Sequence, residues 1–123
     1  LAMHGDVMNL DGWAGRGVSF EYYQHKIGVL DRHCEKVGRD PAEIRHTLTM
    51  PLNVTDDKAS AERFIKTFGP GSMAGPRDHI IERIGKFADA GVYEIMFGLH
   101  ANSNRNDVEA IQRVDEEIVA AFD

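Results

Sequence analysis

The sequence predicts an α/β fold made of three successive β/α units from a larger parallel sheet or barrel. Its apolar periodicity and turn residues read strand, helix, strand, helix, helix, strand, helix. This alternation is typical of parallel sheets, because each parallel connection needs a crossover helix. The 123 residues are about half of the roughly 250 that a closed (β/α)8 barrel needs. We therefore expect one domain, residues 1–123, without an internal boundary.

Three segments have the pattern of strands. Residues 6–10 follow Gly5, which ends a preceding helical turn, and they are expected to form a short buried strand. Residues 44–55 alternate between an apolar and a polar face, and Pro51 removes one donor from the ladder, which predicts a bulge or the end of pairing. Residues 92–99 are nearly all apolar, so we expect them to form the central strand.

Helices are predicted between and after these strands. Ser19 is the expected N-cap of a helix over residues 20–37 with a single apolar stripe, which Gly38 ends. Asp40-Pro41 opens one further helical turn. Two more helices are expected: one that Asp56 or Asp57 caps and that runs to residue 68, and one over residues 77–90. The last helix begins at Asp107 and is expected to direct five apolar side chains inward: Val108, Ile111, Val114, Ile118 and Phe122.

Three loops complete the pattern. Residues 11–17 contain three glycines, which permit a positive φ or the close approach of a ligand. Residues 69–76 are rich in glycine and proline and form the clearest predicted loop. Residues 100–106 form a polar loop after the third strand.

Composition excludes several classes of function. The net charge of −6, with no Lys/Arg run longer than two, argues against a nucleic-acid partner. No apolar run approaches the ~20 residues that span a membrane, and residues 1–15 lack the features of a signal peptide. The single cysteine, Cys34, excludes an internal disulfide and fits a reducing compartment, so we expect a cytoplasmic protein.

Three segments, taken in order, resemble the luciferase-like monooxygenases. Residues 1–10 resemble the family's segment AA-x-x-AD-x-W-N. Residues 25–44, with His33-Cys34 followed by Gly-Arg-Asp-Pro, resemble its helix-to-strand passage L-x-x-HC-x-x-x-GRDP-x-x-I. Gly75-Pro76 and residues 88–97 are similar to the family's ending, in which Ala-Gly-Val precedes the last strand. The resemblance is closest to the deazaflavin-dependent branch of this superfamily.

The resemblance implies a fold and an activity. Members are TIM barrels that bind FMN or coenzyme F420 at the C-terminal mouth and transfer hydride, or activate oxygen, on a small organic substrate. This chain matches only the last three units, so the implied fold is a partial TIM (β/α)8 barrel. The family's phosphate-cradling glycine loop, and the His, Trp and Glu that some members use for chemistry, precede the matched region. The resemblance thus implies that this chain alone is inactive and binds no cofactor.

Candidate binding residues follow the first strand, because sites in TIM barrels lie at the carboxyl ends of strands. We expect Asn9, Trp13 and Arg16 to lie beside the cofactor or substrate. The guanidinium of Arg16 could pair with a phosphate or carboxylate through its fork of donors. The alternative is that Arg16 is solvated and that Trp13 packs against a neighbour.

Two further polar residues follow the other strands. His100 comes directly after the third strand, where a histidine can act as a general acid or base near neutral pH. The alternative is an ordinary loop histidine. Asn53 either donates a hydrogen bond into the mouth or, as we favour, caps the turn before Asp56.

No metal site is predicted. The remaining histidines form no convergent pattern, since His25 and His33 are about two helical turns apart. Cys34 falls on the apolar stripe of its helix and is expected to pack as a small hydrophobe.

Three functional hypotheses follow from the sequence. The first is the C-terminal segment of a flavin- or deazaflavin-dependent oxidoreductase acting on a small molecule. The second is a non-catalytic half-barrel, either a homo-oligomer or bound to a missing N-terminal half, because three parallel strands leave two unpaired edges. The third is a small α/β module with its own ligand at residues 10–18.

Overall fold

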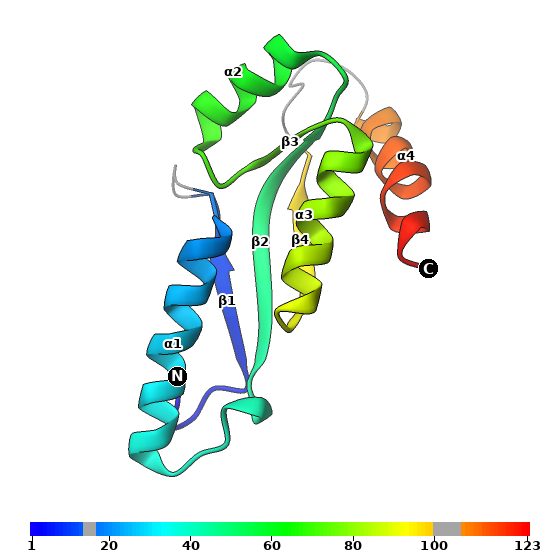
Figure 1. The fold of residues 1–123 in the computed structure, drawn as a ribbon. Helices are drawn as coiled ribbons and strands as arrows, with labels where there is room; N and C mark the ends of the chain where they lie inside the picture. Colours follow the sequence, from blue (N-terminus) through cyan, green and yellow to red (C-terminus); the bar gives the residue numbers. More distant parts are fainter. Residues whose placement is uncertain (14–16, 100–106) are drawn as a thin grey trace.

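The computed structural model describes residues 1–13, 17–99 and 107–123 and has an α/β fold (Figure 1). Its strands form one sheet in which all paired strands run parallel. The strands are β1 (Val7–Asp11), β2 (Arg45–Val54), β3 (Met73–Gly75) and β4 (Val92–Gly98). The predicted α/β class with parallel strands is therefore confirmed.

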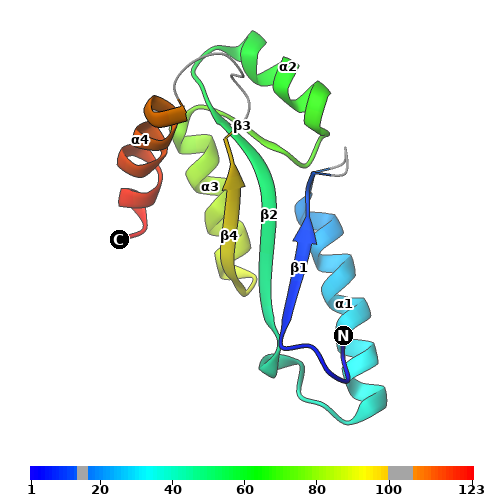
Figure 2. The same cartoon turned by 180° about the vertical axis from the view of Figure 1, so that it is seen from behind.

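β2 is the central strand of this sheet, with β1 on one side and β4 on the other (Figures 1 and 2). The prediction that residues 92–99 form the central strand is therefore wrong for the described sheet. Only one face of β4, with Ile95 and Phe97, packs against the core. Tyr93 and Met96 on the other side remain 66% and 45% exposed, so the apolar run does not reflect burial on both faces.

Pro51 marks a change of partner along β2. β1 pairs with β2 up to Thr49, and β3 pairs with it from Leu52 onward. The predicted end of pairing near Pro51 is confirmed on this side of the strand. On the other side the ladder continues, because Pro51 is in register with Gly98 of β4.

β3 corrects the prediction that residues 69–76 are entirely loop. Its three residues lie beside the last residues of β2, and the Thr55 N–H donates to the Gly75 carbonyl at 2.8 Å. All three residues of β3 are buried. A strand this short has no measurable alternation, and the glycines and prolines on both sides of it indicate a loop.

The helices begin where the sequence predicts them. Ser19, Asp40 and Asp57 each accept a hydrogen bond from a backbone N–H of the following turn, at 3.1, 2.9 and 3.1 Å. Such caps satisfy N–H groups that have no partner within the helix. The elements are α1 (Phe20–Val37), η1 (Pro41–Glu43), α2 (Lys58–Phe68), α3 (Arg77–Asp89), α4 (Asp107–Glu117) and η3 (Val119–Ala121). In the described part of the chain, no helix combines the length and apolarity that crossing a membrane requires.

The core lies between the sheet and the two helices α1 and α3, which cover the same face (Figures 1 and 2). Leu48, Met50 and Leu52 project from β2 into this layer and are 0–1% exposed. Tyr23 and Phe87 meet them from the helices, with ring centroids 5.7 Å apart. A second, smaller cluster contains Cys34, which is fully buried with Ala2, Met8, Leu30 and Ile44, so its predicted role as a packed hydrophobe is confirmed.

α4 is only partly packed against the sheet. Val114 and Ile118 join the main core, as expected. Val108, Ile111 and Phe122 were predicted to point inward, but they are 63%, 55% and 49% exposed. The correct periodicity therefore does not ensure burial, because only the middle of the stripe meets the rest of the described chain.

Arg39 explains the local role of the Gly-Arg-Asp-Pro segment. Its guanidinium donates to the carbonyls of Ala2 and Gly5 at 3.3 and 2.6 Å and pairs with Asp6 and Glu43, both at 3.2 Å. One side chain thus joins the end of α1 to the segment that leads into β1. The two bonds to the carbonyls are partly buried and charge-assisted, whereas Asp6 and Glu43 are 90% and 62% exposed, so their ion pairs with Arg39 are surface pairs that contribute less.

Candidate functional site

One face of the sheet is not covered by α1 or α3, and we call it the open face. Figure 2 shows the strands from this side, with both helices behind them. Register places two rows of side chains across it: Asn9, Thr47 and Glu94, and then Asp11, Thr49 and Met96. The second row lies nearer the carboxyl ends of the parallel strands, where open α/β sheets bind their ligands.

Asn9 is at the centre of a hydrogen-bond network on the open face. The Thr47 and Thr49 hydroxyls both donate to Asn9 Oδ1, at 3.0 and 3.2 Å. With Oδ1 directed toward the two hydroxyls of β2, the amide nitrogen of Asn9 points away from β2. Asn9 is exposed, so this nitrogen can donate to an acceptor, such as a carbonyl, above the sheet.

Trp13 packs over the carboxyl end of β4. A Cβ on Gly98 would overlap carbons of the Trp13 ring, so the absence of a side chain at Gly98 creates the space for the indole. The Phe68 ring meets the Trp13 ring edge-on at 5.6 Å, and the backbone N–H of Trp13 donates to Asp11 Oδ1 at 2.8 Å. Trp13 therefore packs against neighbouring residues, as the alternative interpretation expected. Its role in binding stays a prediction.

The loop after β1 is tied to two other segments. The Gly12 N–H donates to the Thr49 carbonyl at 2.7 Å, and the Gly17 N–H donates back to the Gly12 carbonyl at 3.2 Å. Gly17 also forms an isolated parallel bridge with Gly71, which follows α2. These bonds hold both ends of the predicted binding loop against the sheet.

Arg83 supports this arrangement from α3. Its guanidinium donates to the carbonyls of Ser72 and Gly71 at 2.7 and 3.1 Å. Burial lowers the pKa of the Arg83 guanidinium, and the charge of nearby Glu21 acts in the opposite direction. The side chain therefore holds the segment that touches Gly17, although a buried charge has a cost.

Two predicted site residues lie outside the described residues. Arg16 falls in 14–16 and His100 in 100–106, so their predicted roles in anion binding and proton transfer stay predictions. Asn53 is 6% exposed, and its amide nitrogen donates to Ser60 Oγ of α2 at 3.5 Å. The favoured capping role belongs to Thr55 instead, whose hydroxyl accepts from the Asp57 N–H at 3.1 Å.

Thr47, Thr49 and Gly98 were missed as site residues. Thr47 and Thr49 belong to the predicted polar face of residues 44–55. Their link to Asn9 depends on the register of β1 against β2, because Asn9 lies 38 and 40 residues earlier in the sequence. Gly98 lies within the predicted strand over residues 92–99 and has no predicted role in a site. The space that it leaves becomes visible only once Trp13 is placed beside it.

His46 belongs to the opposite, helix-covered face. Its Nδ1 lies 3.0 Å from the hydroxyl of Tyr23, which donates to the Ala90 carbonyl at 3.1 Å. Because Tyr23 gives its only hydroxyl proton to the Ala90 carbonyl, His46 Nδ1 must donate its own hydrogen to the Tyr23 oxygen. Nε2 is then an unprotonated, buried nitrogen that has no hydrogen-bond partner among the residues that the structure describes. Burial lowers the pKa of His46, with an opposing effect of Asp31, and raises the pKa of Tyr23.

The charges of the open face are unevenly placed. Arg45, at the amino end of β2, lies over the ring of Tyr93 at 4.8 Å. The described side chains that line the site near the carboxyl ends of the strands are Asn9, Asp11, Trp13 and Thr49. None of these four is positively charged. The described residues contain no cluster of three His, Cys, Asp or Glu that could hold a metal ion.

Comparison with known proteins supports the fold. No protein-family model matches the sequence. No curated protein matches it either. Among solved structures, the chain is similar to an F420-dependent secondary alcohol dehydrogenase in complex with an F420-acetone adduct, with a TM-score of 0.58 and 18% sequence identity. The alignment covers 99% of this chain and 44% of that chain, so this chain spans less than half the length of that enzyme. At this identity the likeness shows a shared fold over nearly the whole chain.

Proposed function

We propose that this chain forms the last three β/α units of a partial TIM (β/α)8 barrel in a luciferase-like oxidoreductase that uses coenzyme F420 or FMN. The main support is the polar network of Asn9, Thr47 and Thr49 on the uncovered face of adjacent parallel strands. The fold likeness to an F420-dependent dehydrogenase, over 99% of this chain and 44% of that one, gives the second support. The strand order β1, β2, β4 is the order that consecutive barrel strands would have.

The described residues fit the ring system of such a cofactor better than its phosphate. When bound, F420 or FMN supplies the hydride chemistry. Asn9 offers an outward amide donor for a ring or substrate carbonyl, and Trp13 provides an apolar wall at the same edge of the sheet. The described residues at the carboxyl end of the open face include no Lys or Arg, so a phosphate needs donors outside them, such as the predicted anion partner Arg16.

The chain therefore contributes one wall of the site and does not catalyse the reaction alone. The predicted proton-transfer residue, His100, and the predicted anion partner, Arg16, complete this wall in the proposal. The remaining strands close the barrel and supply the rest of the cofactor site. The substrate is a small organic molecule whose carbonyl or hydroxyl group exchanges the hydride.

Two-dimensional amide NMR with increasing F420, and separately FMN, tests this proposal. We expect weak binding, with shift changes confined to the amides around Asn9, Trp13, Thr49 and Gly98. Asn9→Ala is expected to weaken the changes at least threefold. Gln24→Ala removes an exposed amide from α1, on the covered side, and is expected to leave them unchanged.

Two results would contradict the proposal. Shift changes centred on the helices, or changes that Asn9→Ala and Gln24→Ala affect equally, would place any ligand away from the open face. Oxidation of a secondary alcohol with F420 by the isolated chain would show that the chain is a complete catalyst.

A further inference from the structure

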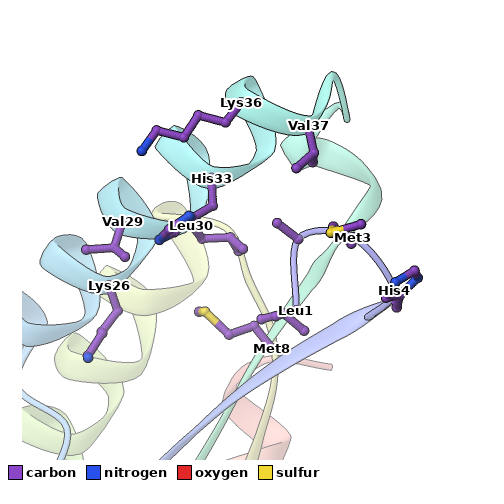
Figure 3. A pocket seen from close by; sticks show the side chains of 11 residues that line it. Leu1, Met3, His4, Met8, Lys26, Val29, Leu30, His33, Lys36 and Val37 are labelled. Carbon is purple, nitrogen blue, oxygen red and sulfur yellow. The ribbon is translucent and has the colours of Figure 1, made fainter.

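A groove runs between α1 and the segment that leads into β1, and we call it the α1 groove. It encloses about 550 Å³ and is lined mainly by apolar side chains. Figure 3 shows Leu1, Met3 and Met8 across from Leu30 and Val37. Leu1, Met3 and Val37 are 56%, 65% and 45% exposed, so much of this apolar surface faces solvent.

The charges that line the α1 groove are all of one sign. They belong to Lys26 and Lys36, which project from α1 at its edge with His33 between them (Figure 3), and no Asp or Glu is among its described lining residues. The chain as a whole has a net charge of −6, so this basic rim contrasts with the rest of the molecule. An apolar floor with a basic rim fits an amphipathic helix with acidic flanks.

The chain itself contains such a helix. Residues 107–123 carry six acidic side chains and one basic side chain, a net charge of −5 out of the total of −6. The exposed side of this segment, which we call the α4 outer face, presents four apolar side chains between 45% and 63% exposed: Val108, Ile111, Val119 and Phe122. Asp115 and Glu116 are exposed beside them.

The two surfaces together hold most of the exposed apolar groups. Among the described residues, seven of the eleven large hydrophobic side chains that are exposed belong either to the α1 groove or to the α4 outer face. A concentration of this kind marks interaction surfaces, whereas single exposed hydrophobes do not. α1 packs beside β1, and α4 lies beyond β4 at the other side of the sheet, so one copy cannot fill its own groove (Figures 1 and 2).

We propose that the α4 outer face of one copy docks into the α1 groove of a second copy. Apolar burial supplies the attraction, and the opposite charges set the orientation. The contact joins two different surfaces, so it is heterologous and produces closed rings or open chains. This inference does not rest on the proposed cofactor or reaction, because both surfaces lie away from the open face.

Sedimentation velocity over a concentration series tests the contact. Lys26→Glu/Lys36→Glu reverses the charge of the rim, and Asp115→Lys/Glu116→Lys reverses the charge of the two exposed acids beside the α4 outer face. Each double variant alone is expected to weaken association at least tenfold, because like charges then face each other. A mixture of the two variants is expected to restore association, since the acidic rim then meets the two lysines introduced beside the α4 outer face.

The control matches the charge change elsewhere. Lys58→Glu/Lys66→Glu lies on exposed positions of α2 and is expected to associate like the unchanged protein. Circular dichroism confirms that each variant is folded. A monomer at every concentration, equal behaviour of the rim and control variants, or a mixture that stays dissociated would each overturn the proposal.

A second pair of variants tests the apolar part. Ile111→Asn and Val37→Asn replace exposed side chains and leave the charge unchanged. Each substitution is expected to weaken association at least fivefold. In the unchanged protein, added salt is expected to weaken association as well, because it screens the opposite charges. Association that survives both substitutions would assign the contact to another surface and overturn the proposal.

Discussion

Gly17 and Gly71 lie so close together that neither position has room for a side chain. A Cβ on Gly17 would overlap the backbone of Gly71 and Ser72, and a Cβ on Gly71 would lie 2.5 Å from the Val18 nitrogen. Gly17 also has φ +62°, which other residues rarely adopt. This crossing joins the loop after β1 to the segment before β3, so it positions the loop that carries Trp13.

Gly71→Ala is expected to destabilise the protein by about 2–3 kcal/mol, because the added methyl group meets backbone atoms that cannot rotate away. Urea unfolding measures the free energy of unfolding. Gly85→Ala is the matched control, since nothing lies within 4 Å of its added Cβ on α3. That control is expected to gain up to about 1 kcal/mol, because alanine favours a helix over glycine. Equal effects of the two substitutions would mean that the crossing is not tight.

Gly98→Ala is expected to displace the Trp13 ring without unfolding the sheet. The added methyl group occupies the position of the ring, and the indole is the movable partner. Because Trp13 is the only tryptophan, its emission reports this change directly, as a red shift and as stronger quenching by acrylamide. Gly85→Ala serves again as the control, with unchanged emission expected. An unshifted spectrum for Gly98→Ala would show that Trp13 does not lie against β4.

Arg83→Met is expected to lower the free energy of unfolding by about 1–3 kcal/mol, because the Gly71 and Ser72 carbonyls lose a charged donor. Trp13 emission is expected to shift as well, since the held segment touches Gly17. Lys86→Met, an exposed position on the same helix, controls for the lost charge. A loss of stability with unchanged Trp13 emission would separate Arg83 from the loop.

The sequence predicted the local features well. Ser19, Asp40 and Asp57 act on N–H groups two or three residues away, so their capping roles follow from neighbouring residues alone. The parallel α/β class likewise follows from the order of the elements. The prediction of a partial barrel extends beyond the described sheet and stays a prediction.

Long-range features were not predictable in the same way. The link between Asn9 and Thr47 needs the register of β1 against β2, and the Gly17–Gly71 crossing needs two loops to be placed together. β3 gains its identity only from its partner, β2. The apolar stripe of residues 107–122 predicted a helix correctly. It did not predict the exposure of Ile111, because burial depends on whether another part of the fold packs against that side of α4.

His46 is expected to make folding sensitive to pH. Burial lowers its pKa in the folded state below the unfolded value of about 6.5, so the unfolded chain binds more protons in this range. The free energy of unfolding therefore falls as the pH drops from above 6.5 toward the lower folded value. Protonation also places a charge on Nε2, which is buried without a partner among the described residues.

Urea unfolding between pH 5 and 8 measures this effect as the difference between the unchanged protein and His46→Asn. The variant lacks the titrating ring. Below pH ~6.5 the free energy of unfolding is therefore expected to fall more steeply for the unchanged protein than for the variant. His25→Asn is the matched control, because His25 is exposed on α1 and its replacement leaves the buried ring in place. A pH-independent difference for His46→Asn, or an equal slope for His25→Asn, would show that the ring does not titrate at a lowered pKa beside Tyr23.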